Sequence, residues 1–312
     1  MSSNKRLKET QIDRLSELPD HLIIQIFSLL EVKQSAITSV LSKRWRYFWR
    51  ESPRLIFREE SSRSKKVGDF VNGVNRALLA VCGRMGLETL EFEFLDNYNS
   101  YNLDVDVWVR FAVKNRVKQV SLLLDSHSYP MYTLPQMMFH NLYLKRLTLQ
   151  RCALDPRRTI VWPSLTELHI KNVELQEHVI GKILSGCPVL YRLVLEYCWG
   201  FKCLEVGSKS LYELEVCDRK DGLYHSEPLL RISAPYVQTL CVSMDAKGRN
   251  LCFGNISCLV KATIGFIGSN WVTDTEEVVD NTKKLLEETR HVKEVKTRGG
   301  YSQVCIDAHY IC

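Results

Sequence analysis

A short apolar motif, L-x-x-L-x-L or a close variant, recurs along most of this chain and constrains its fold more than any other feature. The last two apolar residues of each copy lie two positions apart, so in a β-strand they point to the same face. One strand cannot bury that face alone, whereas stacked parallel strands can, and such a stack forms a curved solenoid. The nine copies begin at Leu87, Val117, Leu144, Leu165, Leu190, Leu211, Val237, Leu259 and Val292.

The distances between copies also favour a solenoid. Successive copies start 30, 27, 21, 25, 21, 26, 22 and 33 residues apart, which mostly fits a leucine-rich repeat with irregular terminal repeats. Helical periodicity between copies predicts helices at 70–79, 105–115 and 176–185, and again at 278–286. The predicted fold class is therefore α/β, with parallel strands on the concave side of a solenoid and helices or loops on its convex side.

The eleven cysteines are scattered, and no C-x-x-C pair occurs among them. Cys152 and Cys198 each stand three residues after a motif, and Asn172 lies near the corresponding place in another copy. Side chains there can hydrogen-bond to the backbone where the chain turns out of a strand. This predicts structural thiols, with no metal ion and no cofactor.

The first fifty residues form a separate apolar unit. Pro19 and Asp20 suit the start of a helix, and Leu22, Ile26, Leu29 and Leu30 follow at helical spacing, with Ile23 and Phe27 widening the stripe. A helix that is apolar around so much of its girth must be covered on more than one side. We expect Ser35 to cap a second helix and Ser42 a third that carries the aromatic run 45–49. Because about forty residues make a marginal core, a partner surface is expected to cover the remainder.

The segments LSELPDHLIIQIFSLL and TSVLSKRWRYFWRESPRLIF resemble a plant-type F-box, and SGCPVLYRLVLEYC resembles a junction of plant F-box leucine-rich-repeat proteins. The resemblance implies a small three-helix unit that docks on a Skp-type adaptor and, through it, on a cullin–RING ubiquitin ligase. Glu31–Ser35 stands where the family usually has a connector resembling Pro-Thr-Lys-Asp, which bears on adaptor affinity. The implied adaptor contacts are Leu18, Pro19, Leu22, Ile26, Leu30, Val40, Leu41, Lys43, Arg44 and Trp45, with Trp45 as the strongest hot-spot candidate by residue type.

The predicted organisation is an N-terminal tail (1–11), the F-box (12–58), a linker (59–68), the solenoid (69–300) and a C-terminal tail (301–312). The N-terminal residues have no apolar stretch of the kind that a secretory signal requires, and no segment is long enough to span a membrane. We therefore expect a location in the nucleus, the cytoplasm or both.

The target-binding face is predicted from motif positions three and five, which point to the concave side. That row holds four basic and five acidic residues. A surface that tracks phosphates is strongly basic, so a protein or small ligand is favoured over nucleic acid. The candidate target-binding residues are Arg146, Glu167, His169, Arg192, Glu213, Glu215 and Lys261.

Catalytic motifs for nucleophilic hydrolysis, phosphate binding, zinc proteolysis and dinucleotide binding are absent from the sequence, so we expect a receptor subunit and not an enzyme. The favoured function is substrate recognition for a Skp–cullin–F-box ubiquitin ligase. Two alternatives are an adaptor-binding protein outside any ligase and a receptor gated by a small ligand. A fourth is nucleic-acid binding through residues 42–66, which carry nine Lys or Arg and three Glu and so account for the net charge of +6.

Overall fold

A computed structural model describes residues 17–38, 40, 44–59, 67–84, 86–94, 98–124, 130–218, 229–245, 250–267 and 283–299. The predicted tails and most of the predicted linker lie outside these ranges. Ten strands form one parallel sheet in the order β1-β2-β3-β5-β7-β8-β10-β12-β14-β15. Their bounds are β1 (Arg54–Arg58), β2 (Thr89–Phe94), β3 (Gln119–Leu124), β5 (Arg146–Gln150), β7 (Glu167–Lys171), β8 (Arg192–Glu196), β10 (Glu213–Cys217), β12 (Thr239–Asp245), β14 (Lys261–Ile267) and β15 (Glu294–Gly299).

All nine predicted copies of the motif form strands of this sheet, and they stack in register. Leu168 of β7 lies between Leu147 of β5 and Leu193 of β8, which in turn lies beside Leu214 of β10. The side chains of this row are buried. The arrangement confirms the predicted α/β solenoid, because each apolar row is covered by the rows before and after it.

Strand β1 was not among the predicted repeats, although it pairs with β2 and begins the sheet. Leu55 and Phe57 occupy the last two motif positions, opposite Leu90 and Phe92. The first position is held by Ser52, which is buried and donates its hydroxyl proton to the carbonyl of Arg54 at 2.7 Å. A polar residue at that position removed the leading apolar signal, so the sequence pattern did not reveal the strand.

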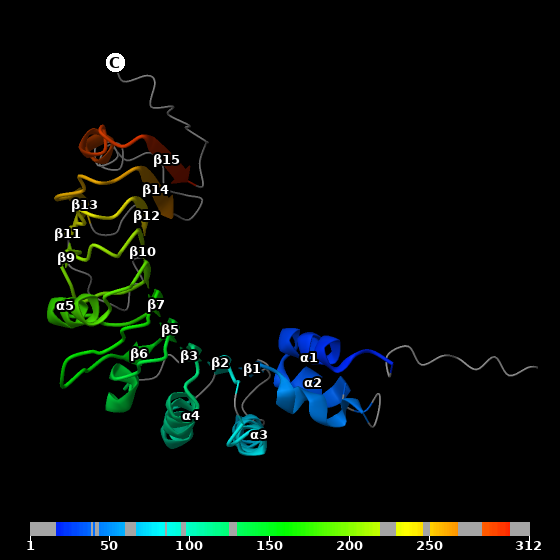
Figure 1. Cartoon of the computed structure of the whole chain (residues 1–312). Helices are drawn as coiled ribbons and strands as arrows, with labels where there is room; N and C mark the ends of the chain where they lie inside the picture. Colours follow the sequence, from blue (N-terminus) through cyan, green and yellow to red (C-terminus); the bar gives the residue numbers. More distant parts are fainter. Residues whose placement is uncertain are drawn as a thin grey trace, which may run out of the picture.

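The convex side changes along the arc in Figure 1, from helices near β1 to short strands near β14. The helices confirm three of the predicted periodic segments, and residues 283–288 of the fourth are helical while its earlier part lies outside the described ranges. The convex elements are α3 (Val67–Ala80), η2 (Tyr98–Tyr101), α4 (Asn102–Lys114), η3 (Gln136–Phe139), α5 (Glu177–Gly186), the strand pair β4 (Tyr132–Thr133) and β6 (Cys152–Ala153), and the sheet β13 (Asn250–Phe253), β11 (Leu229–Ser233) and β9 (Cys203–Glu205).

The cysteines that follow the strands have the predicted structural role. The Cys152 thiol donates to the carbonyl of Gln150 at 3.3 Å, and the Cys198 thiol donates to the carbonyl of Ile170 at 3.4 Å. The chain leaves these strands through left-handed backbone conformations at Arg151 and Tyr197. Burial raises the pKa of the Cys152 thiol, so this thiol stays protonated and serves as a hydrogen-bond donor.

The F-box region forms two short helices and a 3-10 turn, α1 (Asp20–Leu29), α2 (Val32–Thr38) and η1 (Trp45–Glu51), at the β1 end of the arc (Figure 1). The predicted cap at Ser35 is wrong, because α2 begins at Val32 and Ser35 is buried inside the helix. The side chain of Gln34 accepts a hydrogen bond from the backbone N–H of Glu31 at 3.3 Å, which is the return half of a capping box. The predicted cap Ser42 lies outside the described residues.

The largest aromatic cluster of the core lies beneath α3 and α4. The ring of Trp108 stacks on Phe92 with centroids 4.9 Å apart, and its indole N–H donates to Asn75 at 2.7 Å. Asn75 in turn donates to the Asp104 carboxylate at 2.7 Å. One tryptophan therefore fixes the first convex helices both to each other and to the sheet.

We expect Trp108→Ala to lower the free energy of unfolding by about 3–5 kcal/mol, because it leaves a large cavity and an unpaired amide. Urea denaturation followed by circular dichroism measures this change. The neighbouring Val107→Ala is the control, since Val107 is exposed and its truncation is expected to cost less than about 0.5 kcal/mol. Equal losses in the two variants would contradict the assignment of Trp108 to the core.

Candidate functional site

The F-box helices close over a core of Ile23, Phe27 and Trp45. Trp45 is 3% exposed and packs edge-on against Phe27, with ring centroids 5.6 Å apart. Sequence analysis selected Trp45 as the strongest candidate for adaptor contact. The structure places Trp45 inside the F-box unit, so its side chain has almost no surface for a partner to contact. Its role is to support the helices that carry the exposed side chains.

Other apolar side chains of the same unit are exposed. Leu29 is 72% exposed, Ile37 is 64% and Val40 is 86%, and Leu22 and Pro19 are also accessible. We call Leu22, Leu29, Ile37 and Val40 the apolar stripe. Monomeric proteins rarely leave such side chains together in water, and a stripe of this kind is typical of a docking surface.

The predicted adaptor contacts thus fall into different environments. Pro19, Leu22 and Val40 are on the exposed side, whereas Leu18, Ile26 and Leu30 are half-buried and pack against the F-box core. Arg44 forms an ion pair with Asp20. Leu41 and Lys43 lie outside the described residues. The exposed Leu29 and Ile37 were absent from the predicted set. Leu29 lies one turn after the predicted contact Ile26 on α1, and Ile37 lies three residues before the predicted contact Val40.

The unusual connector after α1 contacts the solenoid. The Glu31 carboxylate accepts a hydrogen bond from Arg58 of β1 at 3.3 Å, and Val32 packs against the main core. Arg58 also contacts Glu91 at 3.0 Å and Glu93 at 2.9 Å. These contacts, the hydrogen bond to Glu91 first among them, raise the pKa of Arg58. One guanidinium therefore joins the F-box connector to strand β2.

Two further contacts strengthen this joint. Trp49 of η1 packs against both the F-box core and the solenoid core. The Arg84 guanidinium, at the end of α3, donates to the backbone carbonyls of Ser52 at 3.0 Å and of Glu51. The F-box is consequently packed onto the first repeat and not only tethered to it.

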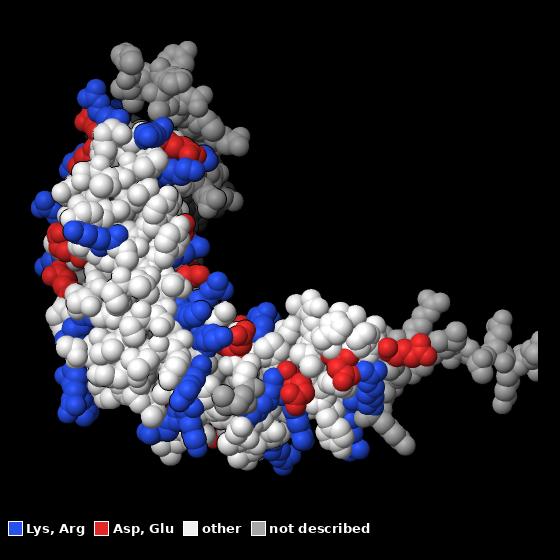
Figure 2. Space-filling view, in the orientation of Figure 1, with Lys and Arg blue, Asp and Glu red and all other residues white. Residues whose placement is uncertain are grey.

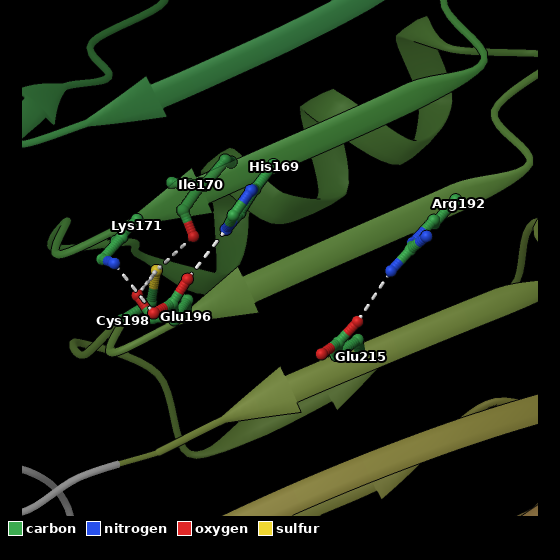
Figure 3. Close-up of polar contacts among 7 residues, drawn as sticks. All are labelled: His169, Ile170, Lys171, Arg192, Glu196, Cys198 and Glu215. Atoms are coloured by element: carbon green, nitrogen blue, oxygen red, sulfur yellow. Dashed lines mark hydrogen bonds and ion pairs between the residues drawn. The ribbon is translucent and has the colours of Figure 1, made fainter. Parts of the chain in front are cut away.

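The seven predicted target-binding residues do lie on the concave strands, and each contacts a side chain of opposite type on a neighbouring strand; Figure 3 shows His169, Arg192 and Glu215 among them. The ion pairs are Arg146–Glu167 at 2.9 Å, Arg192–Glu215 at 2.9 Å, Arg192–Glu213 at 3.7 Å and Lys261–Glu294 at 3.3 Å, and the His169 ring is hydrogen-bonded to Glu196 at 3.1 Å. Glu196 also accepts from Lys171 at 2.9 Å. We call this row the concave ion ladder.

Two members of the ladder, Lys171 and Glu196, were not identified from the sequence, because they stand at motif position seven, one residue beyond the end of the motif. In Figure 2, acidic and basic side chains lie side by side along the inner margin of the arc, beside a broad uncharged band. Exposed pairs of this kind contribute little to stability. The opposite charges of these pairs neutralise one another, so the electrostatic field that a partner meets at the concave face is weak and of mixed sign.

Groups of three or more His, Cys, Asp or Glu that could hold a metal ion are absent from the described residues. Within the same part of the chain, no helix combines the length and the apolar character needed to cross a membrane. The arrangement of the two surfaces is suited to binding.

Two family models match the chain. The F-box domain model matches residues 15–57, and the model described as At1g61320/AtMIF1, LRR domain, matches residues 79–287. Strand β1 thus lies inside the F-box match except for its last residue, Arg58, although it is the first strand of the solenoid sheet. The predicted domain boundaries remain predictions.

Several Arabidopsis thaliana proteins are similar to this chain. F-box/LRR-repeat protein 25 is 30% identical over 230 residues, which cover 73% of this chain and 84% of that protein. F-box/LRR-repeat protein At5g02910 is 28% identical over 88% of this chain and 59% of its own length, and F-box/FBD/LRR-repeat protein At5g56420 is 30% identical over 90% and 64%. The chain therefore spans less than two thirds of the length of several relatives. By its helices, its repeats and these matches, the chain belongs to the family of F-box/leucine-rich-repeat proteins.

Proposed function

We propose that this protein is the substrate-recognition subunit of a Skp–cullin–F-box ubiquitin ligase. The F-box would dock on a Skp-type adaptor, and the leucine-rich repeats would bind the protein to be ubiquitinated. Members of this family are generally non-catalytic adaptors, so the ligase partners supply the chemistry. The proposal involves no cofactor, membrane or nucleic acid, and it places the protein in the nucleus, the cytoplasm or both.

The observation that carries the proposal is the apolar stripe on α1 and α2. Anchors at helical spacing that lie in a partner groove are a recurring mode of recognition. Each fully buried Leu or Ile side chain contributes about 1.5–3 kcal/mol before the costs of association are subtracted. Burial of these four side chains in a partner groove would therefore contribute to adaptor affinity.

The ligase role depends on how the two ends of the molecule are held. Joining a ligase and its target through one receptor raises their effective concentration. The contacts of Arg58, Val32 and Trp49 pack the F-box against the first repeat, which supports a fixed separation between adaptor and target. Co-purification of a cullin with the protein separates the ligase role from adaptor binding outside a ligase.

We expect Leu29→Asp/Ile37→Asp to weaken capture by a purified Skp-type adaptor at least tenfold, which is about 1.4 kcal/mol. Biolayer interferometry with the full chain measures the affinity. Leu79→Asp is the matched control, because Leu79 is similarly exposed but lies on α3, away from the stripe. If the double variant keeps its thermal unfolding midpoint and still binds like the wild type, docking through this stripe is ruled out.

Trp45→Ala is also expected to reduce adaptor capture at least tenfold, which is about 1.4 kcal/mol, but by loosening the F-box core and not by removing a contact. Limited proteolysis should therefore cut the F-box of this variant faster than that of the wild type. Leu18→Ala/Pro19→Ala is expected to weaken capture to a similar degree with unchanged proteolysis. If the F-box of Trp45→Ala resists proteolysis as well as that of the wild type, the structural role of Trp45 is contradicted.

We expect Arg58→Gln to leave adaptor affinity unchanged while it loosens the joint, since Glu31, Glu91 and Glu93 then lose their shared cation. Hydrogen exchange of the β1 amides should accelerate about threefold or more, as local opening becomes easier. The control Arg110→Gln removes an exposed arginine whose ion pair with Asp106, at 3.9 Å, is long. Exchange in β1 that matches this control would show that Arg58 does not hold the joint.

A further inference from the structure

Exposed aromatic side chains gather on a surface that the concave prediction did not include. They lie in the loops that enter the strands, at the edge of the sheet where β5, β8, β10 and β12 begin. We call this surface the tyrosine rim, and it consists of Tyr143, Val189, Tyr191, Tyr212 and Tyr236. Each of these side chains is between 37 and 45% exposed. Tyrosine is enriched at protein interfaces because it joins a large apolar area to a hydroxyl group.

Backbone hydrogen bonds join two residues of the rim, Tyr191 and Tyr212, to a continuous row along the edge of the sheet. The N–H of Tyr212 donates to the carbonyl of Tyr191 at 2.9 Å, and the N–H of Tyr191 donates to Thr166 at 2.9 Å. The same pattern continues from Thr166 to Lys145 at 2.8 Å and from Lys145 to Lys118 at 2.7 Å. Consecutive repeats therefore present two lysines, a threonine and two tyrosines side by side.

The ring faces of the rim are already in use within the protein. Tyr191 and Tyr212 stack on each other with centroids 5.2 Å apart and planes within 6°. The Arg116 guanidinium lies 4.9 Å from the ring centre of Tyr143, and the Lys209 ammonium lies 5.8 Å from that of Tyr236. A partner therefore meets mainly hydroxyl groups and ring edges, and the edge of an aromatic ring carries its positive potential.

The rim is bordered mainly by cations, although the Glu213 carboxylate of the concave ion ladder accepts a hydrogen bond from the Tyr191 hydroxyl at 3.4 Å. Arg116, Lys118, Lys145 and Lys209 border it, and of these Lys118 is paired with Glu88 at 2.6 Å. No carboxylate lies within ion-pair distance of Lys145 among the residues that the structure describes. Hydroxyl donors, ring edges and cations all favour the same chemical group on a partner, a carboxylate.

We propose that the tyrosine rim binds an acidic, extended segment of a partner protein. This inference rests on the proposed function in one respect, that the repeats hold the target. The concave ion ladder is a weaker candidate, because a partner would have to displace pairs that already satisfy one another. Single-stranded nucleic acid is disfavoured, because it needs free ring faces for base stacking and a longer track of cations.

The test uses the full chain and a fluorescein-labelled peptide of alternating glutamate and proline, which proline keeps extended. Fluorescence anisotropy should show binding that weakens as salt is added, because exposed charges are screened. A peptide of alternating lysine and proline should bind at least about tenfold more weakly, since like charges repel across an interface.

Matched double variants then locate the site. Lys145→Gln/Lys209→Gln removes two rim cations and should lower the affinity for the acidic peptide about fivefold or more. Arg146→Gln/Arg192→Gln removes two cations of the concave ion ladder and should change that affinity less than about twofold. Lys145 and Arg146 are adjacent in sequence, but of the two only Arg146 belongs to the concave ion ladder, so the comparison separates the two surfaces. Tyr191→Ser/Tyr212→Ser should weaken binding with both lysines intact. Thermal unfolding confirms that each variant is folded.

The proposal is overturned if the acidic peptide does not bind, if the concave variant loses as much affinity as the rim variant, or if an oligothymidine binds the rim more tightly than the peptide. Adaptor capture by the same preparations tests the proposed function separately. Normal adaptor capture with no peptide binding rejects the rim alone, whereas peptide binding without adaptor capture rejects the ligase role and leaves the rim in place.

Discussion

Each inner strand of the large sheet buries its motif residues because the strands on both sides hold theirs in the same row. Leu168, for example, is covered by Leu147 on one side and Leu193 on the other. Parallel pairing in a constant register is therefore the constraint on which the other features depend. It aligns the charges of the concave ion ladder, it brings Tyr191 beside Tyr212, and it places the Cys198 thiol under the carbonyl of Ile170 in the preceding repeat.

The same constraint explains how the F-box is attached. Strand β1 follows η1 after only two residues and pairs with β2 along its whole length. The last segment of the F-box match is thus part of the solenoid, and the connector after α1 contributes Glu31 and Val32 to the same joint. Two residues of this connector therefore make contacts inside the protein: Glu31 pairs with Arg58, and Val32 packs against the solenoid core.

The concave face of the solenoid and the edge where its strands begin differ in how many of their polar groups are already paired within the protein. On the concave side, cations and carboxylates of neighbouring strands neutralise one another over most of the arc. At the edge where the strands begin, exposed tyrosines lie among cations; there Lys118 is paired with Glu88, and the Tyr191 hydroxyl donates to Glu213. Selectivity for a partner is more readily built on the second kind of surface, because less existing interaction must be given up.

The sequence by itself determined the class of fold, since the spacing of two apolar residues selects one face of a strand and the recurrence of that pair requires stacking. It also identified the structural cysteines and the helical character of the first fifty residues. It did not reveal β1, where Ser52 replaces the leading apolar residue, and it could not distinguish the buried Trp45 from the exposed Leu29. Nor could it pair Lys171 with Glu196 or Arg58 with Glu31. These features depend on which segments, about 25 residues apart, come into contact, and only the tertiary packing decides that.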